Sequence, residues 1–575
     1  MRTPHPMRLS HLRATRTEVV AEHGVATGGH VNEAEAGVRM LQAGGNAIDA
    51  LVAAAFTGYV VEQEQCSLGG YIRIAIYSAE RREFTTIDAF VRVPEKYRPE
   101  LFQPDNSAPL TYYEHPPTLG DAAESGHLAA AVPGAVAGLC AAHEMFGRLP
   151  LAQVLEPAIE AAEAGVLVTW NLALSMHHRL NAIRALPNSA ALLLRNGDLP
   201  EVASAYEAGD RIDTRDLAQT LRLIAQHGAA GFYAGPMAEA IDREFSQNGG
   251  ILSAADLANY RPKIMREKPA RYRGHDYITA NDQITYEALN ILEHFDLAAY
   301  GPDSLEYRHL MAEALGHAFT DNIAHYGDPE FVRSPVDGLA SRAFAADRAK
   351  GLRLDHAASR PIQHGNPWPF EADGQPPEML SARPTLGRIA GTSQMAAADR
   401  EGNLVTCITS VGNSFGSLVV VPGTGVFLNN AMRNFDPRPD HPNSYQPGKM
   451  PIFAVPTLAM AKDGRALFGG CGSGGYKITT GVMHTLVNML DFGMGLQEAI
   501  DGPRVHCQGR ATEVDSRIPA EVQARLAALG HEVVPKEEGP GNTHFGRVNA
   551  IYIDPKTGLL HAGTGPAWHS AAAGY

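Results

Sequence analysis

The sequence predicts a mixed α/β (α+β) protein in which a helix-rich first part precedes a strand-rich last third. Three observations favour this fold class. Apolar and alanine residues recur at helical spacing from Asn32 to Phe56, and amphipathic helical patterns dominate residues 131–352. After residue 391 the pattern changes to short strands separated by turns such as DREGN and PGTG.

The N-terminal region is expected to form two helices followed by a β-hairpin. Within GGNAIDA, the glycine pair Gly44-Gly45 ends the first helix and Asn46 can cap the second. Residues 72–78 (IRIAIYS) and 84–90 (FTTIDAF) then flank the charged turn AERRE. That pattern is typical of two antiparallel strands.

The middle of the chain ends in a segment of different composition. Residues 355–390 are rich in Pro, Gly, Asn, His and Asp and poor in apolar residues, so we expect an exposed, cuttable loop. The strands predicted after it are SQMAAA and LVTCITS, joined by DREGN, and then SLVVV and VFLNN, joined by PGTG.

Composition excludes some partners. The 575 residues are 45% hydrophobic and 19% charged, as in an ordinary globular protein. A net charge of -15 without a cluster of Lys and Arg argues against a nucleic-acid partner. The five cysteines are widely separated and are expected to be reduced and mostly buried. The basic N-terminus lacks an apolar signal-peptide core and no long apolar run follows, so we expect a cytoplasmic protein without a membrane segment.

The Gly391-Thr392 pair is the first candidate for chemistry. A threonine hydroxyl is a poor nucleophile unless a base is adjacent, and the threonine's own amine becomes such a base when the preceding peptide bond is cut. Gly391 tolerates the strained backbone that such an attack needs. If the hairpin turns near Glu401, Thr392 faces Ser410, which could orient it. The alternative is that Thr392 only begins a strand.

Two further patterns each have two interpretations. Residues 470–475 fit GxGxxG before a helix, which favours either a dinucleotide loop or a row of backbone N–H groups that stabilises an oxyanion. Asp491 comes too early for the ribose-binding acid of a dinucleotide site. The second pattern lies on one predicted helix, where four polar residues are spaced four apart: Glu313, His317, Asp321 and His325. They could bind a metal, or they could form a solvated or hydrogen-bonded stripe.

Nearly the whole chain resembles the γ-glutamyltranspeptidase family. The matching blocks keep the family's order: AGGNAIDALVAAAF, EQCSLGGYIRIAIYSAERREFTTIDAFVRVP, AVPGAVAGL, LEPAIEAAEAG, ALNILEHF, EALGHAFTDNIAHYGDPEF, GTSQMAAADREGNLVTCITSVGNSFGS, VPGTGVFLNN, PGKMP, CGSGGYKI, AIDGPRVH and AAAGY. No single block is specific, but their combination is. The helix match favours a structural role for the stripe of Glu313, His317, Asp321 and His325.

The resemblance implies a four-layer αββα sandwich of the N-terminal nucleophile hydrolase type. A heavy segment of residues 1–391 and a light segment of residues 392–575 would arise by cutting between Gly391 and Thr392 and would stay associated. The nucleophile falls on Thr392, the supporting hydroxyl on Ser410, and the oxyanion glycines on Gly474 and Gly475. Catalysis would run through an acyl-enzyme on a small-molecule amide, without a cofactor or metal. A homodimer is compatible with this picture.

Several of the family's substrate-binding positions are altered here. The carboxylate-binding arginine is shifted two places, to Arg92, as in the amidohydrolase branch of the family. In the block that begins at Leu428 and contains Asn430, Asn434 replaces the amine-binding acid and Arg433 precedes it. Phe453 and Ala454 replace the paired serines. Arg92 and Arg433 suggest a carboxylate-bearing donor without a free α-amine, although either could form a structural ion pair.

These departures leave the reaction partly open. Residues 436–449 are short for the family's lid loop, which favours hydrolysis over transfer. Alternatives are a pathway enzyme that cleaves an oxo-acid amide or a C–C bond, an uncleaved inactive homologue that binds a ligand or partner, and a nicotinamide enzyme. Autocleavage and dinucleotide binding discriminate among them.

Overall fold

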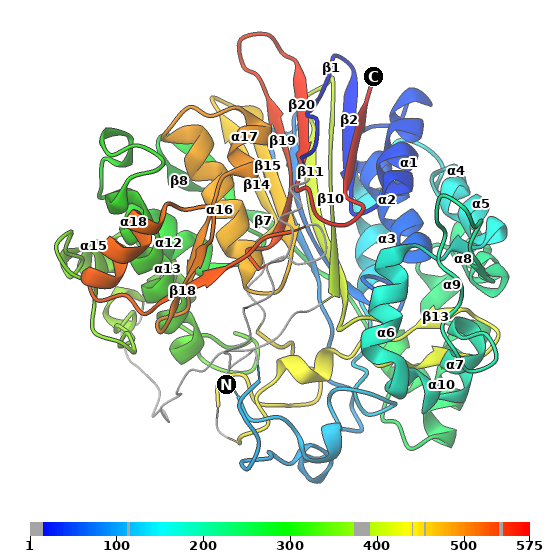
Figure 1. Ribbon diagram of the computed structural model, residues 1–575. Helices are drawn as coiled ribbons and strands as arrows, with labels where there is room; N and C mark the ends of the chain where they lie inside the picture. The colour runs from blue at the N-terminus through cyan, green and yellow to red at the C-terminus, as the bar shows by residue number, and fades with distance from the viewer. Residues whose placement is uncertain (1–14, 112–114, 373–390, 440, 453–455, 540–543) are drawn as a thin grey trace, which may run out of the picture.

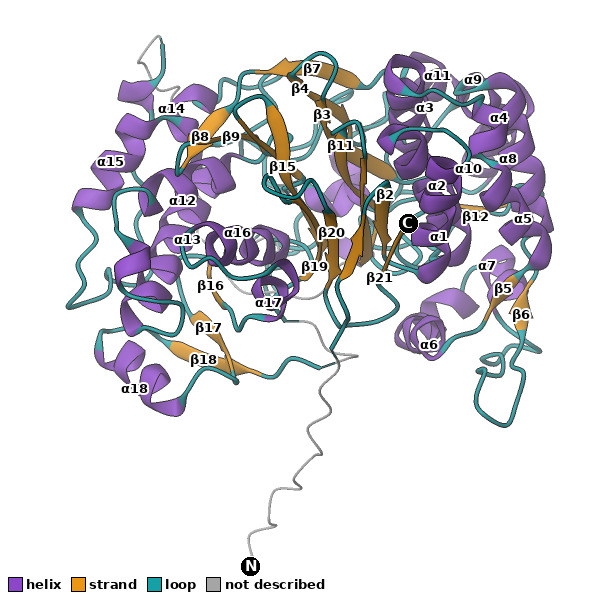
Figure 2. Cartoon of the chain, turned by 90° about the horizontal axis from the view of Figure 1, so that it is seen from above, coloured by secondary structure: helices purple, strands orange, loops and turns teal. Residues whose placement is uncertain are grey.

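Two seven-stranded antiparallel sheets pack face to face between two layers of helices in the computed structural model (Figure 1). The structure describes residues 15–111, 115–372, 391–439, 441–452, 456–539 and 544–575. Strands of one sheet pack directly on strands of the other, and Figure 2 shows both sheets from above with helices outside each. This is the four-layer αββα arrangement expected for the family.

The strands of the first sheet come mostly from the end of the chain. In sheet order they are β1 (Val19–Ala21), β20 (Leu560–Thr564), β19 (Arg547–Ile553), β15 (Arg465–Ser473), β14 (Leu458–Lys462), β9 (His275–Ile278) and β8 (Ala270–Tyr272). The second sheet contains β21 (Ala571–Gly574), β2 (Gly24–Gly28), β10 (Gly391–Asp399), β11 (Leu404–Gly412), β3 (Tyr71–Ser78), β4 (Glu83–Ala89) and β7 (Lys263–Glu267). Residues before and after Thr392 therefore share both sheets.

The outer layers differ in origin. Over the second sheet lie α1 (Val31–Gln42), α2 (Ala47–Val61) and α3 (Ala135–Phe146). Beside the first sheet lie α12 (Gln283–Leu292), α13 (Leu305–His325), α16 (Lys477–Leu490) and α17 (Leu496–Asp501). The remaining helices are α4 (Leu151–Val154), α5 (Glu156–Ala164), α6 (Trp170–Arg184), α7 (Pro187–Leu193), α8 (Arg215–His227), α9 (Ala230–Tyr233), α10 (Gly235–Gln247), α11 (Ala254–Asn259), α14 (Val336–Ala340), α15 (Arg342–Lys350) and α18 (Ala520–Ala528).

Short elements complete the chain. Small sheets pair β5 (Val166–Leu167) with β6 (Arg211–Ile212), and β12 (Val420–Val421) with β13 (Val426–Phe427). A third joins β16 (Val505–Cys507), β17 (Thr512–Asp515) and β18 (Val533–Lys536). The 3₁₀ turns are η1 (Pro99–Phe102), η2 (Leu119–Asp121), η3 (Leu297–Ala299), η4 (Trp368–Phe370) and η5 (Ala431–Asn434).

Local sequence signals explain the first helices and hairpins. Asn46 caps α2 through a capping box with Asp49, as its position after the glycine pair predicts. Every residue of α2 from Ala47 to Val60 is buried, because this helix is apolar on all sides and lies between the second sheet and its neighbours. The predicted hairpins at 72–90 and 393–410 are confirmed as β3–β4 and β10–β11.

Helices dominate residues 131–352, as expected, but short strands also lie within this region. Among them β7 and β8 form sheet edges, and β9 pairs with both β8 and β14. The described part of the expected exposed loop, residues 355–372, lacks strands, and most of its side chains are exposed or half-buried. Trp368 is 1% exposed, and Arg360 binds Glu313 of α13. Residues 373–390 lie outside the described part.

The described chain also bears on the thiols and on membrane insertion. All five cysteines are free, and four of them are buried, as expected. Among the described helices, none has the length and apolar character needed to cross a bilayer.

Candidate active site

Thr392 begins the central hairpin of the second sheet. Gly391 pairs with Gly412 and Ser393 with Thr409, and a register shift between them places Thr392 beside Ser410. Thr392 is 2% exposed, and its Oγ1 lies 2.7 Å from the Gly391 carbonyl oxygen and 3.2 Å from Ser410 Oγ. The predicted juxtaposition of Thr392 and Ser410 is therefore confirmed.

The Gly391 carbonyl receives a second hydroxyl. Ser410 Oγ donates to it at 2.5 Å and accepts the Gly412 N–H at 2.9 Å. Gly391 also packs closely against its neighbours. A Cβ at this position would lie 2.9 Å from the Glu64 carbonyl oxygen. Close packing is therefore one reason for glycine here.

Arg547 connects Thr392 to the glycine turn after β15. Its Nη2 donates to the Thr392 carbonyl at 2.9 Å, and its Nε donates to Ser473 Oγ at 2.7 Å. The next two residues, Gly474 and Gly475, have φ values of +123° and +63°, which favour glycine. β15 pairs antiparallel with both neighbouring strands, so this turn does not belong to the βαβ unit of a dinucleotide fold.

Acidic and amide side chains surround the start of β10. Gln65 Oε1 accepts the Thr392 N–H at 3.1 Å, and Glu62 Oε2 accepts the Ser393 hydroxyl at 2.6 Å. Burial raises the pKa of Glu64 to about 8, with Glu62 adding to the effect. Sequence reasoning missed these residues. Their signal is the polar run EQEQ directly after the apolar helix α2.

Arg433 lies in a charged cluster on the other side of Gly391. Its Nε donates to Glu124 at 2.9 Å and its Nη1 to Asn413 Oδ1 at 2.6 Å. A Cβ on Gly391 would touch the backbone of Asn413, so the cluster borders the scissile residue. Arg179 faces both Glu124 and Arg433, and burial lowers its pKa. Arg179 itself donates to Ser125 Oγ at 3.1 Å, so Glu124 lies near two guanidinium groups and pairs with Arg433.

Amide groups complete this cluster. Asn430 Oδ1 accepts the Asn413 N–H at 2.9 Å, and its Nδ2 donates to the Glu124 carbonyl at 2.9 Å. Asn434 is 1% exposed, and its side chain lies beside the Tyr71 hydroxyl. Burial raises the pKa of Tyr71, while hydrogen bonds with Ser410 and Asn434 and the charge of Arg433 oppose the rise, so Tyr71 lies between the hairpin and this cluster.

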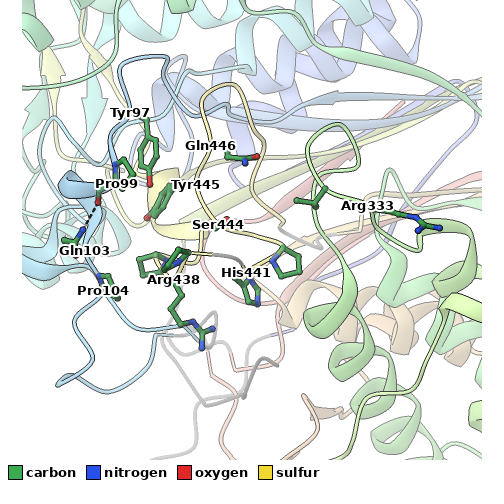
Figure 3. A pocket seen from close by; sticks show the side chains of 14 residues that line it. Tyr97, Pro99, Gln103, Pro104, Arg333, Arg438, His441, Ser444, Tyr445 and Gln446 are labelled. Atoms are coloured by element: carbon green, nitrogen blue, oxygen red, sulfur yellow. Dashed lines mark hydrogen bonds between the residues drawn. The ribbon is translucent and has the colours of Figure 1, made fainter. Parts of the chain in front are cut away.

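A cavity of about 680 Å³ lies beside η5 (Figure 3). Tyr445 in its wall donates to the carbonyl of Met432, the residue before Arg433, at 2.9 Å. The lining combines aromatic, amide and cationic side chains, among them Tyr97, Gln103, Arg333, Arg438, His441 and Tyr445. Burial lowers the pKa of His441 to about 4, so this ring is neutral at pH 7.

Comparison with known proteins identifies the family. The sequence profile described as gamma-glutamyltranspeptidase matches residues 34–575. The chain belongs to the γ-glutamyltranspeptidase family. It is 33% identical over 569 residues to the acylase ACY 1 proenzyme of Pseudomonas sp. strain SE83, which covers 98% of this chain and 96% of the relative. It is 29% identical over 563 residues to the glutathione hydrolase proenzyme of Bacillus subtilis strain 168, with coverages of 96% and 92%.

A solved structure supports the same assignment. The fold matches cephalosporin acylase from Bacillus halodurans with a TM-score of 0.83 and 28% identity, covering 100% of this chain and 98% of that one. This member of the γ-glutamyltranspeptidase family is therefore an enzyme of the N-terminal nucleophile hydrolase type that acts on amide bonds, by hydrolysis or acyl transfer.

The other positions carried over from the γ-glutamyltranspeptidase family lie elsewhere. Arg92 donates to the Gly448 carbonyl at 2.9 Å and lies 3.3 Å from Glu330, so its charge is balanced by a carboxylate of this chain. Arg433 is likewise paired with Glu124. The sequence left two interpretations of these arginines open, substrate binding or a structural ion pair. In the structure, both arginines form an ion pair. Phe453 lies outside the described residues.

The α13 stripe of this γ-glutamyltranspeptidase-family enzyme is buried and not solvated. His317 Nδ1 contacts Arg348 Nη2 at 2.5 Å, and Asp321 binds Arg348 at 2.8 Å. Across the described residues, ligand atoms of His309, Glu313 and His531 come within 4.8 Å of one another. Arg360 binds both Glu313 and His531, so a guanidinium already occupies this group.

Proposed function

We propose that this enzyme cuts its own chain between Gly391 and Thr392 and then cleaves amides through the freed Thr392. One observation carries the proposal. Thr392 Oγ1 lies 2.7 Å from the carbonyl oxygen of the bond to be cut, and Ser410 donates to that oxygen at 2.5 Å. A hydrogen bond to the carbonyl oxygen stabilises the negative charge that develops when its carbon is attacked.

Maturation follows as a balanced acyl shift. Thr392 Oγ bonds to the Gly391 carbonyl carbon, the C–N bond breaks, and the hydroxyl proton ends on the Thr392 nitrogen. Water then hydrolyses the resulting ester, which leaves a carboxylate on Gly391 and restores the hydroxyl. The Thr392 N–H already donates to Gln65 Oε1 at 3.1 Å, and the same amide can hold the new amine.

The reaction with substrate repeats this chemistry, with the substrate's amide carbonyl in the position that the Gly391 carbonyl occupied before cleavage. The free amine of Thr392 accepts the hydroxyl proton, Oγ attacks the amide carbonyl, and the leaving amine takes the proton. Gly474 and Gly475 supply backbone N–H groups for the oxyanion. Their turn is connected to Thr392 through Ser473 and Arg547. Water attacks the acyl-enzyme in the second step.

We assign the donor to carboxylate-bearing amides without a free α-ammonium, and not to glutathione. Arg433 pairs with Glu124, and the nearby Arg179 adds a second positive charge that this one carboxylate does not balance. Asn434 offers a neutral, buried amide where an ammonium would need a carboxylate. We further propose that water rather than an amine accepts the acyl group, because residues 436–449 are short for a lid loop. By this chemistry the enzyme is closer to its acylase relative than to its glutathione hydrolase relative.

Intact-mass spectrometry of the purified wild type and of Thr392→Ala tests the proposal. We expect two wild-type masses that break between Gly391 and Thr392, and one uncut mass for the variant. N-acyl donors with a carboxylate, each tested with and without an α-amine, then test the donor class. A single uncut wild-type mass would contradict the proposed maturation and favour an inactive binding homologue. Turnover of the amine-bearing donors alone would overturn the assigned donor class.

A further inference from the structure

A chain of buried hydrogen bonds leads from the nucleophile to two carboxyl groups. Ser393, next to Thr392, donates through Oγ to Glu62 Oε2 at 2.6 Å. The carboxyl groups of Glu62 and Glu33 hydrogen-bond to each other, and Glu33 Oε2 accepts the Gly29 N–H at 2.7 Å. Ser393 and Glu33 are 0% exposed and Glu62 is 1% exposed, so water does not separate these groups.

Two carboxyl groups that face each other must share a proton, because neither carboxylate can donate. The remaining oxygen of each, Oε1, has no donor among the other described residues, as expected if those two atoms hold the proton between them. Burial raises the pKa of Glu33 well above its usual range, and the neighbouring Glu62 raises it further. Glu33 therefore holds its proton more tightly than an isolated carboxyl group does.

The surrounding backbone leaves this pair little room to move. A Cβ on Gly29 would overlap the side chains of both Glu62 and Ser393, so the turn after β2 packs directly against the pair. Glu62 also ends α2, and its backbone N–H donates to the Gly58 carbonyl. The carboxyl groups consequently connect α1 and α2 to the first residues of β10.

We infer that the Glu33–Glu62 pair positions the nucleophile: through Ser393 it holds the start of β10, so that Thr392 Oγ1 stays at the Gly391 carbonyl only while the pair retains its shared proton. The inference rests on the proposed function and adds two positioning residues to it. Neither carboxyl group contacts the reacting atoms in the structure.

The charges around the pair give the direction of its pH dependence. Among the described residues, the ionisable groups that face it from neighbouring elements are His30, Tyr59, Glu64, Cys66, Cys407, Arg547 and His569. With one shared proton the pair carries one negative charge, which Arg547 balances while Glu64 is protonated. Losing that proton places a second negative charge in a buried site and separates the carboxylates. Maturation should therefore slow as the solution becomes alkaline.

The experiment follows autocleavage of newly made precursor. Cell-free synthesis is stopped, the sample is shifted to buffers between pH 6 and 9.5, and appearance of the fragment beginning at Thr392 is timed by intact mass. We expect the wild-type rate to fall at least about tenfold from pH 7 to 9.5. Glu62→Gln accepts from Ser393 and donates to Glu33 without a shared proton. In a Glu64→Gln background, which removes the ionisation of Glu64 near pH 8, its rate should therefore change less than about twofold.

Two further variants complete the test. Ser393→Ala removes the connection and should slow cleavage at least about tenfold at every pH. Glu287→Gln is the matched control, because Glu287 and Asp321 form a second buried acid pair in the opposite outer layer, which should leave the wild-type pH profile unchanged. If Glu62→Gln fails to fold, Glu33→Gln gives the same readout.

The outcomes separate this inference from the proposed function. A wild type that cuts, with Glu62→Gln in the Glu64→Gln background losing rate at alkaline pH as the wild type does, overturns the inference and leaves the proposed function standing. Ser393→Ala cutting at the wild-type rate also overturns it. A wild type that never cuts overturns both.

Discussion

Glu64 provides a quantitative link between burial and stability. Its side chain is 2% exposed, Asn171 Nδ2 donates to its Oε1 at 3.2 Å, and burial raises its pKa from 4.5 to about 8. Replacement by Gln keeps the acceptor for Asn171 and resembles the protonated acid in shape and charge. Glu64→Gln therefore removes the titration without leaving a cavity.

The direction of the pH dependence follows from whether Glu64 ionises first in the folded or in the unfolded chain. Below pH 4.5 the carboxyl is protonated in both the folded and unfolded chain, so its contribution to stability is fully present. As pH rises toward 8, the unfolded chain ionises while the folded protein still holds the proton, and the wild type loses stability relative to Glu64→Gln. At about 1.4 kcal/mol per pH unit, the relative loss between pH 5 and pH 8 is about 3.5 kcal/mol.

Urea unfolding at pH 5, 6, 7 and 8, followed by circular dichroism, measures this difference. Both proteins should carry Thr392→Ala, so that maturation does not differ between them. Glu35→Gln on the exposed face of α1 is the matched control and should show no such pH-dependent gain. If the stability difference between Glu64→Gln and its parent is the same at pH 5 and pH 8, Glu64 is ionised throughout and the burial argument is wrong.

Three substitutions test the remaining parts of the site. Ser410→Ala removes the donor at 2.5 Å from the Gly391 carbonyl and should slow autocleavage about 10²–10³-fold, timed by loss of the uncut chain; an unchanged rate would exclude Ser410 from maturation. Gly474→Ala places a Cβ on a residue with φ of +123°, so the free energy of unfolding should fall by about 1–3 kcal/mol and kcat should also fall. Equal melting temperatures of the variant and the wild type would refute the backbone strain. Arg433→Gln should raise KM for carboxylate-bearing donors about tenfold or more, with little change for uncharged analogues; equal effects on both would indicate a purely structural ion pair.

Local signals predicted much of the fold and the centre of the site. The glycine pair and Asn46 located the boundary between α1 and α2, and the turn at DREGN predicted that Thr392 would lie next to Ser410. The helix boundary and the pairing of Thr392 with Ser410 each depend on a short segment of chain, because helix capping and the strand register of one hairpin fix their geometry. The strands β7–β9 escaped prediction because they are short and lie amid helical patterns.

By itself, the sequence determined the change from a helix-rich to a strand-rich part, the antiparallel hairpin that begins at Gly391, and membership in a family through its ordered blocks. Only the tertiary structure decided what surrounds Thr392. Gln65 and Arg547 contact it from 327 and 155 positions away in the chain, and Glu62 contacts the next residue, Ser393, from 331 positions away. The pairing of Arg433 with Glu124 likewise depends on how distant segments pack. Such contacts leave no periodic pattern in a sequence, because they arise only when separate layers bury their polar groups against one another.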